Sequence, residues 1–538
     1  MPADLIVTNA KIYTAELDQK WASAFAVRDG KFLAVGADED IQAFAGPDTS
    51  HMDLQGQLVL PGLCDAHIHF TMYALSLNRI DLFEVPSLDE LKRRLAEKAQ
   101  ATPSGTWLQG FGWNQTLWDD PRFPTKDDLD EITTDHPVML KEKSGHAAIV
   151  NSVALQAAGI TEGIANPDGG EFVRDVNGAL TGLLFEAPAM NLVSNIIPPP
   201  TEAELDAAVI AAQKVAHQFG LVAVHDLDGK QGFTTFQRLH RQGKLRVRAV
   251  SHVAMAQLDD ALGLGLRVGL GDAWLRVGGL KLFADGALGP RTAAMLAPYE
   301  GEPDNYGITI VDKEDMIAMA SKASAAGLPT VVHAIGDRAN HDVLDVFAAI
   351  RTQEAERNVA RQTLRHRLEH VQVLHPDDLY RLADLDVIAS VQPIHCTQDM
   401  KNIDRYWGDR GQYSYAFRTF LDSGATLAFG SDAPVETPNP FVGIHAAVTR
   451  RRADGYPGEA GWYPEQRLTV AEAVDAYTIG AAYAESLDTV MGSICVGKYA
   501  DFIVPDQDIF ECDPMVLKDV QVKLTVIDGE TVFQREEM

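Results

Sequence analysis

The chain has 538 residues, of which 46% are hydrophobic and 23% charged, so it has ample apolar material for a core and is not a disordered protein. This length predicts one large domain with additions, because an ordinary domain takes roughly 100 to 200 residues and a barrel about 250. Lys and Arg total 46 against 76 Asp and Glu, a net charge of −30, which disfavours nucleic acid and anionic membrane surfaces as partners.

Cysteine usage and the first residues indicate the compartment. The four cysteines lie far apart without CxxC spacing, which argues against a disulfide framework and against a cysteine zinc site. Asp4 stands where a signal peptide needs positive charge, and no apolar run approaches the roughly 18 residues of a membrane span. We therefore expect a cytoplasmic protein that does not enter a membrane.

The chain begins and ends with short strand-like runs that are separated by turns. Asp29-Gly30 and Asp528-Gly529 are hairpin turn signals at the two ends. Because isolated hairpins are marginal, we expect both ends, residues 1–62 and 488–538, to pair into one small β-sandwich. The runs cover residues 5–13, 24–27, 31–35, 58–60, 500–504, 520–527 and 531–533.

Between the two ends, buried-strand signals alternate with helical stretches. Eight such strands, each followed by a helical stretch, predict an α/β fold of the (β/α)₈ TIM barrel type over residues 63–487. The predicted strands cover residues 63–70, 221–227, 245–253, 275–284, 330–335, 365–371, 387–392 and 426–431.

One interval in this alternation is too long. About 150 residues separate the first two predicted strands, which is far beyond a single crossover helix. We therefore predict a folded insertion after the first strand, covering about residues 72–205. Its end is marked by three prolines, 198–200, and by the capping-box pattern that runs from Thr201 to Glu204 and opens the next helix.

The first barrel strand closes on the sequence Asp65-Ala66-His67-Ile68-His69. Alternate residues of a strand face the same way, so His67 and His69 project into one space. With 16 histidines in the chain, one HxH pair has a substantial chance of arising by accident, and packed or surface histidines are the alternative interpretation.

Further side chains stand at the C-terminal ends of other predicted strands, where the catalytic residues of barrels lie. Each alone has a structural explanation, such as a core histidine, an N-cap aspartate or a lysine paired with Asp285. Agreement of all of them in strand position favours a metal site. The six candidates are His67, His69, Lys281, His333, His370 and Asp432.

These motifs resemble the metal-dependent amidohydrolase superfamily, whose members share a barrel and a small flanking β-sandwich. The chain is most similar to amidohydrolase family 3, which includes N-substituted formamide deformylase-like enzymes. The resemblance spans most of the chain and is specific for the fold and the metal site, although not for the substrate. It is carried by residues 60–69, 136–140, 145–146, 150–155, 181–186, 281–288, 333–340, 390–393, 430–435 and 492–502.

The resemblance implies a centre for one or two divalent metal ions. Two metals would be bridged by a lysine that has reacted with carbon dioxide, since an unmodified ammonium has three donors and no lone pair. Imidazole and carboxylate ligands favour zinc, with manganese, iron and cobalt as alternatives. In the implied set, His67 and His69 bind one metal with Asp432, His333 and His370 bind the second, and carbamylated Lys281 bridges them.

A mechanism follows from this ligand set. A metal lowers the pKa of bound water from about 16 towards 7 and polarises the substrate oxygen. Asp432 is the candidate general base, because it reaches both metal and water and can pass the proton to the leaving nitrogen.

Substrate contacts are expected from the insertion and from the loops that follow the strands. Trp113 either lines an apolar pocket or belongs to the insertion's own core. His146 is a candidate for orienting a carbonyl, and Glu186 for reaching the site. Asp285 and Arg291 either anchor a polar group or form a salt bridge.

The predicted function is hydrolysis of carbon–nitrogen bonds other than peptide bonds in small amides, formamides or cyclic amides. Three alternatives stay open: an esterase or lactonase on the same site, a nucleobase deaminase, and a non-catalytic relative that keeps the barrel as a scaffold. The predicted partner is a small-molecule substrate, and a homodimer is a further expectation.

Overall fold

The computed structural model describes residues 2–83, 85–115, 118–143, 146–167 and 169–536. Two compact units are present, one formed by Met1–Tyr73 with Val209–Met538 and the other by Ala74–Ala208. The second unit falls where the sequence predicts an insertion. Among the described residues, no helix has both the length and the apolar composition that a membrane span requires.

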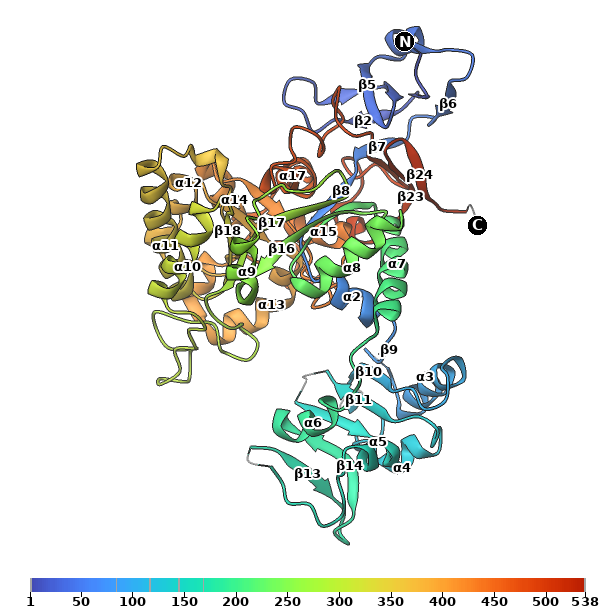
Figure 1. The fold of residues 1–538 in the computed structure, drawn as a ribbon, viewed down its shortest axis with the longest axis vertical. Helices are drawn as coiled ribbons and strands as arrows, with labels where there is room; N and C mark the ends of the chain where they lie inside the picture. The colour runs from blue at the N-terminus through green and yellow to red at the C-terminus, as the bar shows by residue number, and fades with distance from the viewer. Residues whose placement is uncertain (1, 84, 116–117, 144–145, 168, 537–538) are drawn as a thin grey trace. The chain divides into compact units, whose positions relative to one another are not determined.

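The predicted barrel is confirmed, as eight parallel strands that follow one another around a single sheet (Figure 1). Each predicted strand is found, with ends that differ by at most three residues. Their buried side chains explain why the strands form near-continuous apolar runs. The strands are β8 (Leu63–Ile68), β15 (Leu221–Asp226), β16 (Arg248–Ala254), β17 (Leu275–Phe283), β18 (Thr330–Ala334), β19 (Arg367–His370), β20 (Ile388–Val391) and β21 (Leu427–Phe429).

The barrel closes where the chain after β21 meets β8. The backbone N–H of Asp432 donates to the His67 carbonyl at 2.7 Å, and the N–H of Ser431 donates to Asp65 Oδ1 at 3.0 Å. Gly430 is required here, because a Cβ at this position would lie 2.4 Å from the backbone nitrogen of His67. This close approach brings the segment that carries Asp432 against the strand that carries His67.

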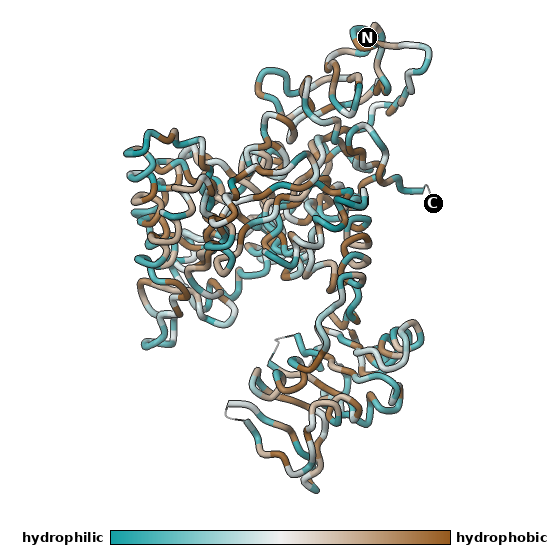
Figure 2. The backbone as a smooth tube through the Cα atoms, in the orientation of Figure 1, coloured by the Kyte–Doolittle hydropathy of each residue, from teal (hydrophilic) through white to brown (hydrophobic). Residues whose placement is uncertain are grey.

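Helices cover the outside of the barrel strands. Figure 2 shows hydrophobic and hydrophilic stretches alternating along the backbone of this unit. The main helices of this unit are α2 (Phe70–Ser76), α7 (Glu202–Gln218), α8 (Lys230–Arg241), α9 (Leu258–Gly263), α10 (Lys313–Ala325), α11 (Asp337–Glu356), α12 (Arg381–Asp384), α13 (Pro393–Tyr406), α14 (Phe417–Ser423), α15 (Pro440–Thr449), α16 (Val470–Tyr477) and α17 (Ile479–Ala484).

The predicted β-sandwich is also present, and it joins the two ends of the chain. Its sheets share one core, in which the rings of Phe25 and Phe502 lie 5.0 Å apart. The two ends pair directly, since Ile503 lies opposite Leu60. One sheet contains β1 (Leu5–Thr8), β4 (Ala24–Arg28), β5 (Lys31–Gly36) and β6 (Ser50–Asp53), and the other contains β2 (Lys11–Tyr13), β3 (Trp21–Ala22), β7 (Leu58–Pro61), β22 (Phe502–Pro505), β23 (Val522–Ile527) and β24 (Glu530–Gln534).

The inserted unit has a mixed six-stranded sheet and its own hydrophobic core. In sheet order, its strands are β13 (Glu171–Arg174), β14 (Leu180–Phe185), β12 (Ala147–Val150), β11 (Val138–Glu142), β10 (Leu108–Trp113) and β9 (Ile80–Asp81). Its helices are α3 (Leu88–Ala101), α4 (Lys126–Asp130), α5 (Ser152–Ala157) and α6 (Glu186–Ser194).

Candidate metal centre

Side chains from several barrel strands meet at the C-terminal ends of those strands. His67, His370 and Asp432 each offer a ligand atom, and these atoms lie within 4.8 Å of one another. His69 joins them, because its Nε2 is 3.6 Å from Asp432 Oδ1, the same oxygen that lies 3.5 Å from His67 Nε2. His333 lies beside His370, with ring centroids 4.4 Å apart.

Each of the four histidines has one ring nitrogen against an oxygen. These oxygens belong to carboxylates, an amide and a backbone carbonyl, so in the neutral ring the proton sits on that nitrogen and the other nitrogen keeps its lone pair. This is the arrangement found around metal-binding histidines. The contacts are His67 Nδ1 to Glu369 Oε2 at 2.5 Å, His69 Nδ1 to Asp228 Oδ1 at 2.9 Å, His370 Nδ1 to Gln392 Oε1 at 2.7 Å and His333 Nε2 to the Gly286 carbonyl at 3.0 Å.

Burial favours the neutral, metal-binding form of two of these rings. Burial, with Lys281 contributing, lowers the pKa of His333 to about 3. Burial and the neighbouring rings of His333 and His67 hold the pKa of His370 well below its usual range. Both rings are therefore uncharged at neutral pH and have lone pairs to offer a cation.

Lys281 is the most unusual side chain of the group. The residue is buried, and its Nζ has no hydrogen-bond partner among the described residues; its near contact is the Phe283 ring, 4.8 Å away. Burial lowers the pKa of Lys281 to about 8, in spite of the nearby carboxylates of Glu369 and Asp432. Burying an amine without a hydrogen-bond partner destabilises the fold. Such a group is expected where a bound ligand or a chemical modification supplies the missing interactions.

A β-bulge turns Lys281 into the barrel. Ser251 on β16 lies opposite Val277 on β17, but Val253, two residues later, lies opposite Leu280, three residues later. The extra residue falls at Gly278 and Gly279, where a Cβ on Gly278 would lie 2.7 Å from the ring of His252. Because side chains alternate along a strand, one extra residue exchanges the two faces, and the Lys281 side chain enters the barrel.

The carboxylate of Asp432 is shared between two sets of neighbours. Its Oδ1 faces His67 and His69, whereas its Oδ2 lies 3.3 Å from His395 Nε2. Burial alone would raise the pKa of Asp432, but the hydrogen bond from His395 and the neighbouring rings of His67 and His370 outweigh it and hold the pKa well below its usual range. The group is therefore an ionised carboxylate at neutral pH, able to ligate a cation or accept a proton.

Two of the converging residues have left-handed backbone. The φ angles are 71° at His370, 46° at Val371 and 59° at Asp432. Such angles cost non-glycine residues on the order of 1 to 2 kcal/mol each and persist only where the surroundings impose them. At His370 the change of direction lets consecutive residues, Glu369 and His370, both approach His67.

Two predicted substrate contacts of the barrel unit have structural partners instead. The carboxylate of Asp285 is fully buried and accepts three backbone N–H groups, those of Ala294, Ile335 and Gly336. It therefore joins the loops that follow β17 and β18. Arg291 forms an ion pair with Glu302 at 2.5 Å, which agrees with the salt-bridge alternative.

The other three predicted contacts lie on the inserted unit. Trp113 is fully buried in the core of that unit, and its indole N–H donates to the Leu140 carbonyl at 2.9 Å, so it has no surface to offer a substrate. His146 and Glu186 are exposed and lie within hydrogen-bonding distance of each other, at 3.0 Å. Their contact with a substrate stays a prediction.

Four residues of the site were not predicted from the sequence. Asp228 directly follows the second predicted strand and His395 stands three residues after the seventh, so the strand-end rule that selected the candidate ligands also covers both positions. Gln392 directly follows the largely apolar strand β20, where a polar side chain is the available signal, and Glu369 lies next to the predicted ligand His370 in a buried strand that also contains Arg367.

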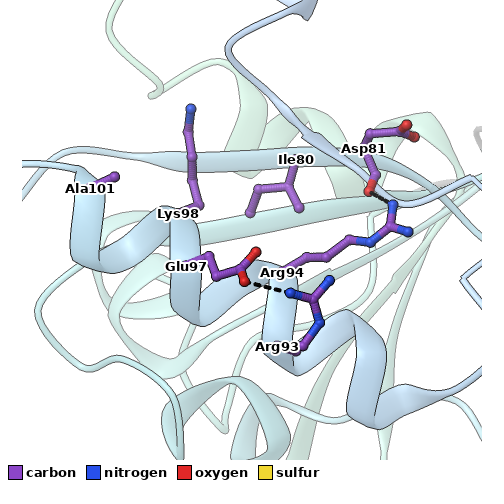
Figure 3. Close-up of a pocket in the computed structure, with 7 residues that line it drawn as sticks. All are labelled: Ile80, Asp81, Arg93, Arg94, Glu97, Lys98 and Ala101. Atoms are coloured by element: carbon purple, nitrogen blue, oxygen red, sulfur yellow. Dashed lines mark hydrogen bonds and ion pairs between the residues drawn. The ribbon is translucent and has the colours of Figure 1, made fainter. Parts of the chain in front are cut away.

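A surface groove on the inserted unit has a different character (Figure 3). Its basic residues Arg93 and Arg94 contact Glu97 and the Asp81 carbonyl. Both guanidinium groups are thus engaged within the groove, and among the described residues none of its lining side chains belongs to a group that could hold a metal ion.

Comparison with known proteins agrees with this geometry. Residues 51–533 match the amidohydrolase family. The chain belongs to this family. It is 33% identical to a putative amidohydrolase, YtcJ, of Bacillus subtilis over 97% of this chain and 98% of the relative. It is 29% identical to the N-substituted formamide deformylase of Arthrobacter pascens over 99% of this chain and 98% of that enzyme.

A solved structure supports the same assignment. An uncharacterised metal-dependent hydrolase from Pyrococcus horikoshii superposes with a TM-score of 0.79 and is 28% identical, covering 95% of this chain and 99% of that one. This amidohydrolase is thus a metal-dependent hydrolase of the class that acts on carbon–nitrogen bonds.

Proposed function

We propose that this amidohydrolase cleaves small amides, formamides or cyclic amides at a zinc centre on the C-terminal face of its barrel. The observation that carries the proposal is the meeting of His67, His370 and Asp432 beside the buried, unpartnered amine of Lys281. The similarity to a formamide deformylase along nearly the whole chain supports the substrate class.

The residues present fit one or two divalent ions. His67, His69 and Asp432 would hold one ion, and His333 with His370 would hold a second. Nitrogen and carboxylate ligands of this kind favour zinc. When bound, the metal supplies an activated water and polarises the substrate carbonyl.

Lys281 would bridge the two ions as a carbamate. Its lowered pKa keeps part of the amine neutral near pH 7. The neutral nitrogen would attack the carbon of carbon dioxide: an N–C bond forms, one C=O π bond breaks with its electron pair moving to oxygen, and the nitrogen releases one proton to solvent. The product is an anionic oxygen ligand, which removes the cost of burying an unpartnered ammonium.

Asp432 would handle the proton of the reaction. Its Oδ1 faces the metal-binding histidines and its Oδ2 faces His395, so one carboxylate can ligate through one oxygen and accept a proton on the other. The same group then delivers this proton to the leaving nitrogen, because an amine is a poor leaving group until it is protonated.

A substrate panel tests the proposal. The zinc-reconstituted protein is incubated with N-formyl amines, N-acyl amines, cyclic amides, esters and lactones, and release of amine, alcohol or acid is followed. We expect amine release from at least one amide class, abolished by chelation and restored by zinc. Turnover of esters alone, or ammonia release from nucleobases alone, would contradict the substrate class, and a wild-type protein that retains no metal would contradict the metal centre.

A further inference from the structure

Two charged residues of β19 are completely buried beneath the metal centre. Arg367 and Glu369 lie two positions apart on one strand, so they share the inner face of the barrel. Neither side chain has any exposed surface. Charged groups are buried to this extent only where they are paired.

Both oxygens of Glu369 are in use. Oε2 lies 2.5 Å from His67 Nδ1, and Oε1 accepts from Arg367 Nε at 2.9 Å. A carboxylate offers acceptors alone, so the neutral His67 ring must have its proton on Nδ1. The lone pair of His67 is then on Nε2, the atom that faces Asp432 Oδ1.

Arg367 cannot turn away from Glu369, because its remaining donors are also engaged. Nη1 donates to Glu485 Oε1 at 2.7 Å and lies 3.1 Å from His225 Nδ1. Nη2 donates to Ser390 Oγ at 2.9 Å and to the Ala66 carbonyl. Besides Glu369, the guanidinium therefore contacts four other residues. One of these contacts is with the backbone of Ala66, the residue before His67.

We propose that Arg367 and Glu369 are positioning residues that select the metal-binding tautomer and the ring orientation of His67. This inference rests on the proposed metal centre and adds the part of the barrel that prepares it. Glu369 keeps the proton of His67 on Nδ1, and Arg367 holds the Glu369 carboxylate in the position that makes this contact. Groups that orient a metal-binding histidine in this way typically contribute 10-fold to 100-fold to metal affinity.

A purely structural role is the competing explanation, in which Glu369 serves to neutralise buried Arg367. The chain offers a matched control for this, because Glu485 is a second buried carboxylate partner of Arg367, and its contacts among the described residues are with Arg367 and His252 rather than with His67. Glu369→Gln and Glu485→Gln each remove one negative charge from the guanidinium. Only the first removes the carboxylate from His67.

The experiment compares zinc dissociation constants of the wild type and both variants, measured by competition with a chromogenic chelator. We expect Glu369→Gln to weaken zinc binding about 10-fold to 100-fold, and Glu485→Gln to bind like the wild type even where its unfolding midpoint is lower. Equal zinc affinities in the two variants would overturn the inference while leaving the proposed function intact. A wild-type protein that binds no zinc would overturn both.

A second variant covers the case in which Glu369→Gln does not fold. Glu369→Asp keeps the charge that Arg367 needs but shortens the reach to His67, so it should fold and still lose zinc affinity. Nitrogen-15 spectra of the histidine rings add a readout that is independent of activity. We expect a wild-type His67 protonated at Nδ1, and a His67 protonated at Nε2 in the wild type would refute the assignment.

Discussion

Replacement of Lys281 by methionine should stabilise the metal-free protein while it disables the metal centre. Methionine matches the lysine stem in length and is at home in a buried apolar space. In the metal-free fold, the Lys281 amine is buried and finds no hydrogen-bond partner in the described part of the chain, so the wild type bears the free-energy cost of its charge. That cost is present in the folded state and absent in the unfolded chain.

The magnitude follows from the pKa of Lys281. Burial lowers the pKa from 10.5 to about 8, and this net change already includes attraction by Glu369 and Asp432. A difference of about 2.5 pKa units corresponds to about 3 kcal/mol of destabilisation. For a lysine with a lowered folded pKa, this penalty is fully present below about pH 8 and disappears as the pH rises through 10.5.

Urea unfolding of metal-free protein in buffer free of carbon dioxide measures the effect. We expect Lys281→Met to be about 3 kcal/mol more stable than the wild type at pH 7, and the advantage to fall to about 1.5 kcal/mol at pH 9.5. Leu282→Met, at the next buried position of β17, is the control and should change stability by less than about 1.5 kcal/mol at both pH values. A Lys281→Met protein that is less stable than the metal-free wild type, or an advantage that does not change with pH, would refute the reasoning.

Three further predictions address the proton acceptor, the inserted unit and the acid limb. Asp432→Asn should keep the far-ultraviolet circular dichroism spectrum of the wild type and lose about 100-fold or more in turnover. Near-normal steady-state rates in this variant would show that Asp432 is not the general base. Trp113→Ala should destabilise the inserted unit by about 3 to 5 kcal/mol, because it empties a buried position and removes the indole hydrogen bond to the Leu140 carbonyl, and urea titration followed by limited proteolysis measures this. A decrease of less than about 1 kcal/mol in the free energy of unfolding would contradict this, because it would mean that neighbouring side chains fill the space left by the indole. Burial opposes ionisation of Glu472, but Arg418 and Thr469 lower its pKa to about 2 from 4.5, so its contribution is present above about pH 4.5 and is lost as the pH falls towards 2. Because Glu472 is partly exposed and solvent screens its ion pair, Glu472→Gln should cost about 1 to 2 kcal/mol at pH 7, less than the full pKa change would give, and progressively less in acid; a pH-independent difference would contradict this.

The fold could be predicted because its signals are local. The apolar runs that became the barrel strands, and the Asp-Gly turns at both ends, depend on short-range periodicity and backbone preference. The candidate ligands could be selected from the same information, since the end of a strand is a position in the chain as well as in space. His67, Lys281 and His333 were identified in this way although no contact between them is visible in the sequence.

The tertiary structure decided how these side chains are used. Whether Trp113 and Asp285 meet a substrate or a backbone depends on which distant segments surround them, and both proved to be enclosed. The bulge at Gly278 turns Lys281 inward by a shift of one residue relative to β16, and the tautomer of His67 depends on Glu369, 302 positions away. Periodicity reports which face of an element is apolar, whereas hydrogen bonds and close approaches between strands exist only once the barrel has closed.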